Sequence, residues 1–219
     1  MDGDGSIQVN HWRYKILQYR LVIKLKNCPE NIAMLNLIKQ YIGGNIKLVQ
    51  KDKFVIWVVN DKKQIRRIIR IFDKYPPLTL RLRSQLTFML ECFKQENVDL
   101  YFKTRNKKYL QHKIKEIKFY KSYFNEWLSG FIEAEGCFSI RSKNNIHSFS
   151  IGQNNDKYIL DFIKNHFCIF NEVRNKKDKF WFIEVYRKSI LLNIIDHCNK
   201  YPLLGEKLVS FNKFKDLFK

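Results

Sequence analysis

Two acidic residues in this chain have neighbours that suit chemistry on a phosphate ester. Asp4 and Glu135 are each followed by a glycine and then by residues that alternate in polarity as in a β-strand. Carboxylates hold divalent metal ions, and such ions can make an attacking water more acidic and neutralise the charge of a leaving oxygen. A single acidic residue before a glycine is more typical of a cap or a solvated charge. It is the recurrence of the pattern that favours a paired site.

The residues before Glu135 predict the helix that positions it. Apolar residues recur at helical spacing between Leu128 and Ile132, and small residues among them would let another backbone approach closely. We expect Gly136 to end the helix in the left-handed conformation. The residues beyond it alternate as a strand does. Glu135 is therefore expected at a helix end.

A second, shorter copy of the pattern opens the chain. Residues 1–9 match the end of the longer pattern, with Asp4 in the place of Glu135. The segment Asp73-Lys-Tyr-Pro-Pro-Leu78 also recurs, as Asn199-Lys-Tyr-Pro-Leu-Leu204. Proline turns after amphipathic helices could produce the second similarity alone. Two signatures that recur in the same order indicate a duplication.

We predict an α+β fold of two pseudo-symmetric repeats, each with two strand pairs in a four-stranded antiparallel sheet and flanking helices. The first repeat spans residues 1–95, a basic linker spans 96–122, and the second repeat spans 123–219. Helices between the strand pairs are expected at 32–41 and 158–167. Residue 1 falls inside the first pattern, so the opening helix of the first repeat is missing and Asp4 would sit on a frayed terminus.

The charge of the chain points to a polyanionic partner. There are 41 Lys and Arg residues against 21 Asp and Glu, a formal net charge of +20. No apolar run approaches the roughly 20 residues of a membrane-spanning helix, and no secretory signal is visible. The 5 cysteines are odd in number and scattered, which favours reduced, intracellular thiols over a zinc site or disulfides. Abundant Lys, Asn, Ile, Phe and Tyr suggest an A+T-rich gene, as in many organelles.

The expected strands have one apolar and one polar face. Gln and Asn pair with adenine edges and Arg with guanine, and a two-stranded ribbon fits the major groove of DNA. Any antiparallel sheet with one solvated face alternates in this way, so it is the net charge that favours DNA. The predicted contacts are Ser6, Gln8, Asn10, Gln18, Arg20, Lys24 and Lys47, then Ser139, Arg141, Lys143, Ser148, Ser150 and Arg174, extended outward by Asn45, Gln50, Asn175 and Lys177.

The segment Leu128-Ser-Gly-Phe-Ile-Glu-Ala-Glu-Gly136 resembles, position by position, the LAGLIDADG motif of homing endonucleases. The resemblance implies the double-motif, organellar intron-encoded type with its first motif truncated. The two sheets would form a curved saddle over a long DNA site. Asp4 and Glu135 would meet where the motif helices pack, as catalytic ligands of Mg²⁺, one facing each DNA strand.

Further roles follow from the same resemblance. A basic residue after the proline turn would neutralise charge at the phosphate, and Lys207 occupies that place. Arg81 is its equivalent in the first copy and keeps the charge with a different reach. Asp2 and Glu133 lie two residues before the candidate ligands, and we expect them to pack or cap.

Three functions remain open from the sequence. The leading one is a monomeric homing endonuclease that cuts double-stranded DNA in the mitochondrion, or alternatively the chloroplast. The second is an RNA maturase that assists splicing of its intron RNA, and the third is a degenerate DNA-binding protein without catalysis. The presence of both Asp4 and Glu135 favours the nuclease. Because the first motif is truncated, the chain as it stands is expected to be poorly stable and weakly active.

Overall fold

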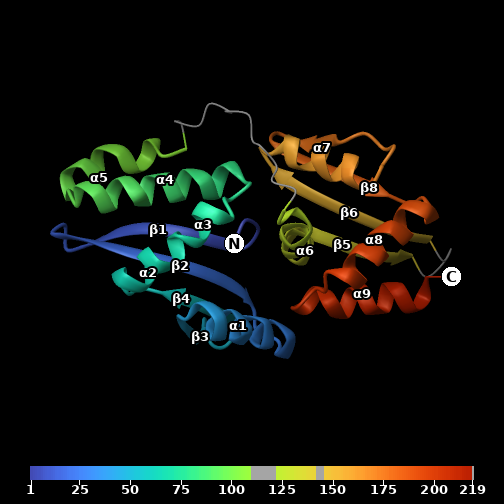
Figure 1. The fold of residues 1–219 in the computed structure, drawn as a ribbon, viewed down its shortest axis with the longest axis horizontal. Coiled ribbons are helices and arrows are strands. Elements are labelled where there is room, and N and C mark those ends of the chain that lie inside the picture. The colour runs from blue at the N-terminus through green and yellow to red at the C-terminus, as the bar shows by residue number, and fades with distance from the viewer. Residues whose placement is uncertain (110–121, 142–145, 219) are drawn as a thin grey trace. The chain divides into compact units, whose positions relative to one another are not determined.

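The computed structural model describes residues 1–109, 122–141 and 146–218. These residues form two compact units, one up to residue 119 and one from residue 120 (Figure 1). Within the described residues, no helix is both long enough and apolar enough to cross a membrane.

The first unit is built on a four-stranded antiparallel sheet with the strand order β1-β2-β4-β3. Its strands are β1 (Gly5–Trp12), β2 (Ile16–Lys26), β3 (Asn45–Val49) and β4 (Phe54–Val59). Its helices are α1 (Pro29–Ile42), α2 (Lys62–Ile69), α3 (Ile71–Lys74), α4 (Leu80–Gln95) and α5 (Val98–Thr104), followed by a short 3-10 turn.

One face of this sheet is buried under the helices. Ile7, Tyr19 and Leu21 belong to one apolar cluster with Phe88 of α4 and Tyr101 of α5. Figure 1 shows α4 and α5 side by side along β1 and β2. The alternation predicted for the first hairpin is confirmed, because β1 and β2 bury every second residue over most of their length.

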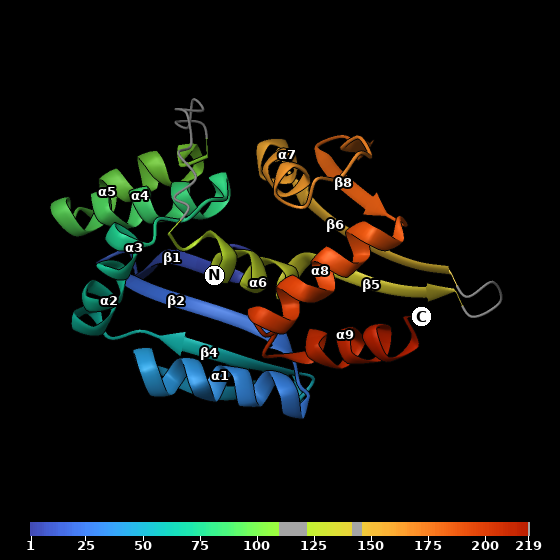
Figure 2. The same ribbon diagram turned by 45° about the vertical axis from the view of Figure 1, so that its right-hand side comes forward.

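The second unit repeats this arrangement with the strand order β5-β6-β8-β7. Its strands are β5 (Gly136–Arg141), β6 (Ile146–Asn154), β7 (Arg174–Lys177) and β8 (Phe180–Val185). Its helices are α6 (Phe124–Glu135), α7 (Lys157–His166), α8 (Lys188–Lys200) and α9 (Glu206–Leu217). Figure 2 shows α6, α8 and α9 gathered beside β5. Equal strand orders in the two units confirm the predicted duplication and the α+β fold.

The segment between the repeats is partly helical. Residues 98–107, which the sequence places in the linker, form α5 and the 3-10 turn. Val98, Tyr101 and Phe102 follow helical spacing and pack on the core of the first unit, with Tyr101 buried. The pattern is too short to stand out in a basic segment. The rest of the expected linker, residues 110–121, lies outside the described residues.

Candidate active site and nucleic-acid interface

Glu135 is the last residue of α6, and β5 begins at the next residue. The helix is fixed by its apolar side, where Leu128, Phe131 and Ile132 are buried. It packs against β5, β6, α8 and α9 of its own unit. The prediction that a helix presents this carboxylate at its end is confirmed.

Gly136 ends the helix for a different reason from the one predicted. Its backbone is extended, with φ −71° and ψ 150°, so the expected left-handed conformation is wrong. A Cβ at this position would lie 2.7 Å from the carbonyl oxygen of Ile132. Gly5 is similar, because its Cβ would lie 2.6 Å from the carbonyl oxygen of Met1. Each strand turns away so closely over the preceding turn that a side chain does not fit.

In the first unit, the carboxylate two residues before Asp4 caps a helix. Asp2 is buried and accepts hydrogen bonds from the backbone nitrogens of Leu78, at 3.1 Å, and Thr79, at 2.9 Å. The Thr79 hydroxyl also donates to it, at 2.6 Å. Thr79 is the N-cap of α4, where unpaired N–H groups and the helix dipole favour a negative charge.

Glu133 caps a helix in the second unit, as Asp2 does in the first. It accepts hydrogen bonds from the backbone nitrogens of Leu204, at 3.1 Å, Gly205, at 3.0 Å, and Lys207, at 2.9 Å. Gly205 is the N-cap of α9. The capping role predicted for both carboxylates is confirmed.

The two candidate ligands are more accessible than Asp2, since Asp4 is exposed and Glu135 is half-buried. Among the described residues, no three His, Cys, Asp or Glu side chains gather closely enough to hold a metal ion. An ion at either carboxylate would therefore take most of its ligands from water or from a bound phosphate. This fits Mg²⁺, which usually keeps several waters and is held by one or two carboxylates.

Arg81 is committed to the backbone around Asp4. Its Nη1 donates to the carbonyl oxygen of Gly5, and its Nη2 donates to those of Asp2 and Gly3, each at 2.6 Å. The prediction that Asp4 sits on a frayed terminus is therefore wrong, because Arg81 and the Asp2 cap hold residues 2–5 against α4.

Lys207 has a different environment. It is the second residue of α9, as Arg81 is of α4, and it is half-buried. Its backbone nitrogen donates to Glu133. Within the described part of the chain, its ammonium group makes no hydrogen bond or ion pair.

The open face of the first sheet carries the predicted polar residues. Gln8 lies opposite Arg20, and Asn10 lies opposite Gln18, so the four side chains share one face. Asn10, Gln18, Arg20, Lys24 and Lys47 are exposed, while Ser6 and Gln8 are half-buried.

The open face of the second sheet matches the prediction less closely. Ser139 is half-buried, Arg141 and Arg174 are exposed, and Ser150 is half-buried. Ser148 lies opposite Ser139 on the same face but is only 3% exposed. Lys143 lies outside the described residues.

Sequence reasoning missed three residues on this second face. Glu184 lies opposite Ser150 and Phe182 opposite Gly152, which places Phe180, Phe182 and Glu184 on the open side of β8. The two phenylalanine rings stack with centroids 6.5 Å apart. Period-two alternation in Phe180–Val185 is the signal that would have found them.

A buried polar network lies behind α6. The Ser129 hydroxyl donates to the carbonyl oxygen of Tyr201, at 2.7 Å, and lies 3.1 Å from Nε2 of His197. Because the single hydroxyl proton goes to the carbonyl, His197 donates through Nε2. Burial and the nearby His166 lower the pKa of His197 to about 4, which keeps the imidazole neutral. The network joins α6 to α8 and to Tyr201, the C-cap residue of α8.

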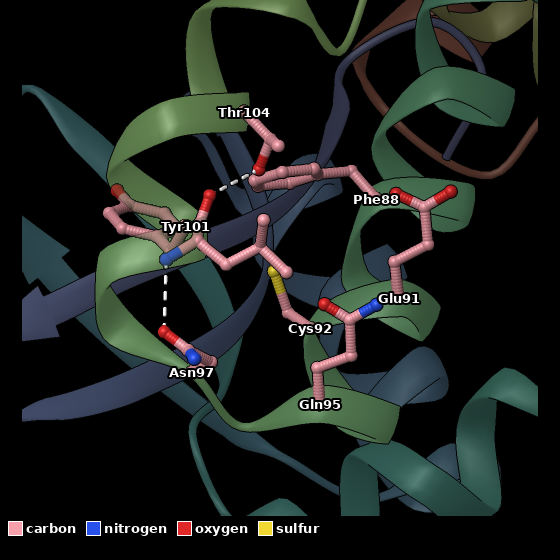
Figure 3. Close-up of a pocket in the computed structure, with 8 residues that line it drawn as sticks. Phe88, Glu91, Cys92, Gln95, Asn97, Tyr101 and Thr104 are labelled. Atoms are coloured by element: carbon pink, nitrogen blue, oxygen red, sulfur yellow. Dashed lines mark hydrogen bonds between the residues drawn. The ribbon is translucent and has the colours of Figure 1, made fainter.

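A pocket of about 240 Å³ lies between α4 and α5, in the helical layer of the first unit (Figure 3). Cys92 and Thr104 are among its lining residues. Burial raises the pKa of the Cys92 thiol to about 11, so this cysteine is neither a nucleophile nor a metal ligand at neutral pH.

Comparisons with known proteins agree with this geometry. A family model described as LAGLIDADG endonuclease matches residues 1–92 and 128–218. The probable intron-encoded endonuclease aI3 of Dictyostelium citrinum is 47% identical over 228 residues, covering 100% of this chain and 92% of that protein. Its namesake in Debaryomyces hansenii is 42% identical over 250 residues, covering 98% of this chain but only 36% of that longer protein. A solved structure, the I-LtrWI LAGLIDADG homing endonuclease bound to target DNA, has a TM-score of 0.77 and 27% identity, covering 99% of this chain and 86% of that one.

Proposed function

Because the chain belongs to the LAGLIDADG endonuclease family, we propose that it is an intron-encoded homing endonuclease. It makes a site-specific double-strand break in DNA by hydrolysing a phosphodiester bond in each strand. The observation that carries this proposal is the pair of carboxylates before the first strand of each sheet. In each unit one carboxylate caps a helix. A second, accessible carboxylate follows two residues later.

We propose Asp4 and Glu135 as the metal ligands, one for each strand, with Mg²⁺ as the ion. A bound divalent ion makes the attacking water more acidic and neutralises the leaving oxygen. The capped carboxylates fix the backbone beside each ligand, so that the ligand carboxylates need little rearrangement on binding. Lys207 supplies positive charge near the phosphate in the second unit.

The open faces of the two sheets are the proposed DNA interface. Their cations and amides lie on regular strands, at the spacing from which a ribbon reads base edges. The net charge of +20 supplies the attraction to phosphates. Phe182 and Glu184 add a flat apolar surface and an acceptor suited to cytosine.

We propose that the chain acts as a monomer in the mitochondrion. A monomer suffices because both candidate ligands are on one chain. Relatives that are intron-encoded endonucleases and a composition typical of an A+T-rich gene support an organellar setting.

The test uses a target selected by the protein itself from a randomised duplex library in Mg²⁺. Glu135→Gln should cut at least one strand about 100-fold more slowly or worse, since the amide supplies no charge to the metal. Binding measured without metal should be nearly unchanged. Glu126→Gln is the matched control, because Glu126 is exposed in the first turn of the same helix.

Cutting of both strands by Glu135→Gln at the rate of the unmodified chain would refute the assignment. If the unmodified chain cuts no duplex but accelerates splicing of an intron RNA, the maturase function takes its place.

A further inference from the structure

Two basic residues occupy equivalent places in the two units. Arg81 and Lys207 are each the second residue of the helix that follows a proline turn. The backbone amide of each helix's N-cap residue donates a hydrogen bond to the capping carboxylate of the same unit. The two positions are therefore equivalent in structure as well as in sequence. The hydrogen bonds of the two side chains can be compared directly between the units.

The guanidinium of Arg81 is occupied by three carbonyl oxygens. It donates to Asp2, Gly3 and Gly5, the residues on either side of Asp4, each at 2.6 Å. Hydrogen bonds from a charged donor are roughly twice as strong as neutral ones. Turning the Arg81 guanidinium away toward a DNA phosphate would break hydrogen bonds that hold the backbone on both sides of Asp4.

Lys207 has no such commitment. Its backbone is fixed by the Glu133 cap, at 2.9 Å, while its ammonium group makes no hydrogen bond or ion pair among the described residues. The side chain is a flexible four-carbon stem with a point charge. Its ammonium group can turn toward a phosphate without breaking a hydrogen bond or ion pair to the described residues.

We propose that Arg81 is a positioning residue that holds Asp4, and that Lys207 alone of the pair neutralises charge at a scissile phosphate. This rests on the proposed function. The consequence is that the two DNA strands are cut at unequal rates, and a nicked duplex accumulates before the double-strand break.

The experiment follows each strand separately on the selected target, labelled with a different fluorophore at each 5′ end. The unmodified chain should cut one strand at least about tenfold faster, since one electrostatic donor is worth 10²–10³ in rate at its largest. Lys207→Met should slow the faster strand and leave the Mg²⁺ concentration for half-maximal cutting unchanged.

Arg81→Lys keeps the charge but cannot span three carbonyls as a planar fork does. It should raise the Mg²⁺ concentration for half-maximal cutting of one strand by about 10–100-fold, the effect expected for the residues that orient a ligand. The other strand should be unaffected. A general loss of stability would slow both strands together and would overturn the proposal, as would an Arg81→Lys variant that cuts like the unmodified chain.

Hydrogen–deuterium exchange provides a measurement independent of cutting. In Arg81→Lys, exchange of the amides of residues 3–6 should accelerate, while exchange at residues 136–140 should not change. If the unmodified chain cuts no DNA, the proposed function fails but this readout still tests the role of Arg81. Unchanged exchange at residues 3–6 would refute it.

Discussion

The same substitution at two positions of α6 distinguishes a residue that stabilises the fold from one that is a candidate metal ligand. Glu133→Gln and Glu135→Gln remove the same charge two residues apart on the same helix. The structure gives Glu133 three backbone amides at the start of α9. Glu135 is at the helix–strand junction, with the candidate metal role. We expect the first variant to be unstable and the second to be stable but inactive.

The size of the effect at Glu133 follows from its contacts. A helix cap contributes about 0.5–2 kcal/mol, and a hydrogen bond to a charged group about 1.5–3 kcal/mol. Glutamine keeps one acceptor oxygen but turns an NH₂ group toward an amide donor. Because the site is only partly buried, we expect Glu133→Gln to lower the free energy of unfolding by about 2 kcal/mol. With a typical urea dependence of about 2 kcal/mol per molar, the unfolding midpoint falls by about 1 M.

The assay is urea unfolding followed by circular dichroism. Asp2→Asn is the matched change in the first unit and should have a similar cost, because Asp2 accepts from two backbone amides and a hydroxyl. Glu135→Gln should stay within about 0.5 kcal/mol of the unmodified chain. Equal destabilisation by Glu133→Gln and Glu135→Gln would refute the division of roles.

Three further predictions concern binding and stability. Affinity for the selected DNA should fall with salt with a log–log slope on the order of −5 or steeper, because many cations displace counterions; a flat affinity between low and physiological salt would contradict the proposed interface. Since the pKa of His197 is lowered to about 4 in the fold, the unfolded chain binds the proton first as pH falls. Stability should therefore be full above about pH 6.5 and decrease by about 3 kcal/mol toward pH 4, and His197→Gln should flatten this curve in thermal unfolding. Gly136→Ala should cost about 1–3 kcal/mol, because its Cβ would lie 2.7 Å from the Ile132 carbonyl oxygen. Gly130→Ala is the control: a Cβ there meets nothing within 4 Å, so it should stabilise the helix by about 0.5–1 kcal/mol in chemical denaturation.

Much of the fold is readable from local pattern. The period-two alternation of β1 and β2 gives their buried face, and the two repeated signatures give the duplication, whereas the strand order within each sheet comes only from the structure. The capping role of Asp2 could be inferred because it lies two residues before Asp4, as Glu133 lies two residues before Glu135 in the other repeat. Its partners could not, since Leu78 and Thr79 are far away in sequence and only the folded turn brings them together.

The remaining errors also concern contacts and backbone conformations that the local sequence does not specify. The contacts of Arg81 depend on the chain path of residues 2–5, which no pattern specifies. Gly136 looked like a left-handed cap because glycine has two separate uses, positive φ and close approach, and the sequence does not distinguish them. Ser148 has the polarity of an exposed residue and is buried in the fold, and its sequence pattern does not distinguish it from the half-buried Ser150.

The two units make the same contact, a carboxylate that accepts from the N-cap amide of a helix, with different residues. In the first unit a short aspartate works with the N-cap Thr79, whose hydroxyl bonds Asp2 and also accepts from the amide of Leu82. In the second unit the N-cap is Gly205, which has no side chain, and the longer Glu133 reaches one amide further into the helix. The longer carboxylate of the second unit thus accepts from an amide inside its helix, as the Thr79 hydroxyl does in the first unit. A glycine in place of Thr79, or the shorter aspartate in place of Glu133, would therefore each take away an acceptor that one helix amide has now.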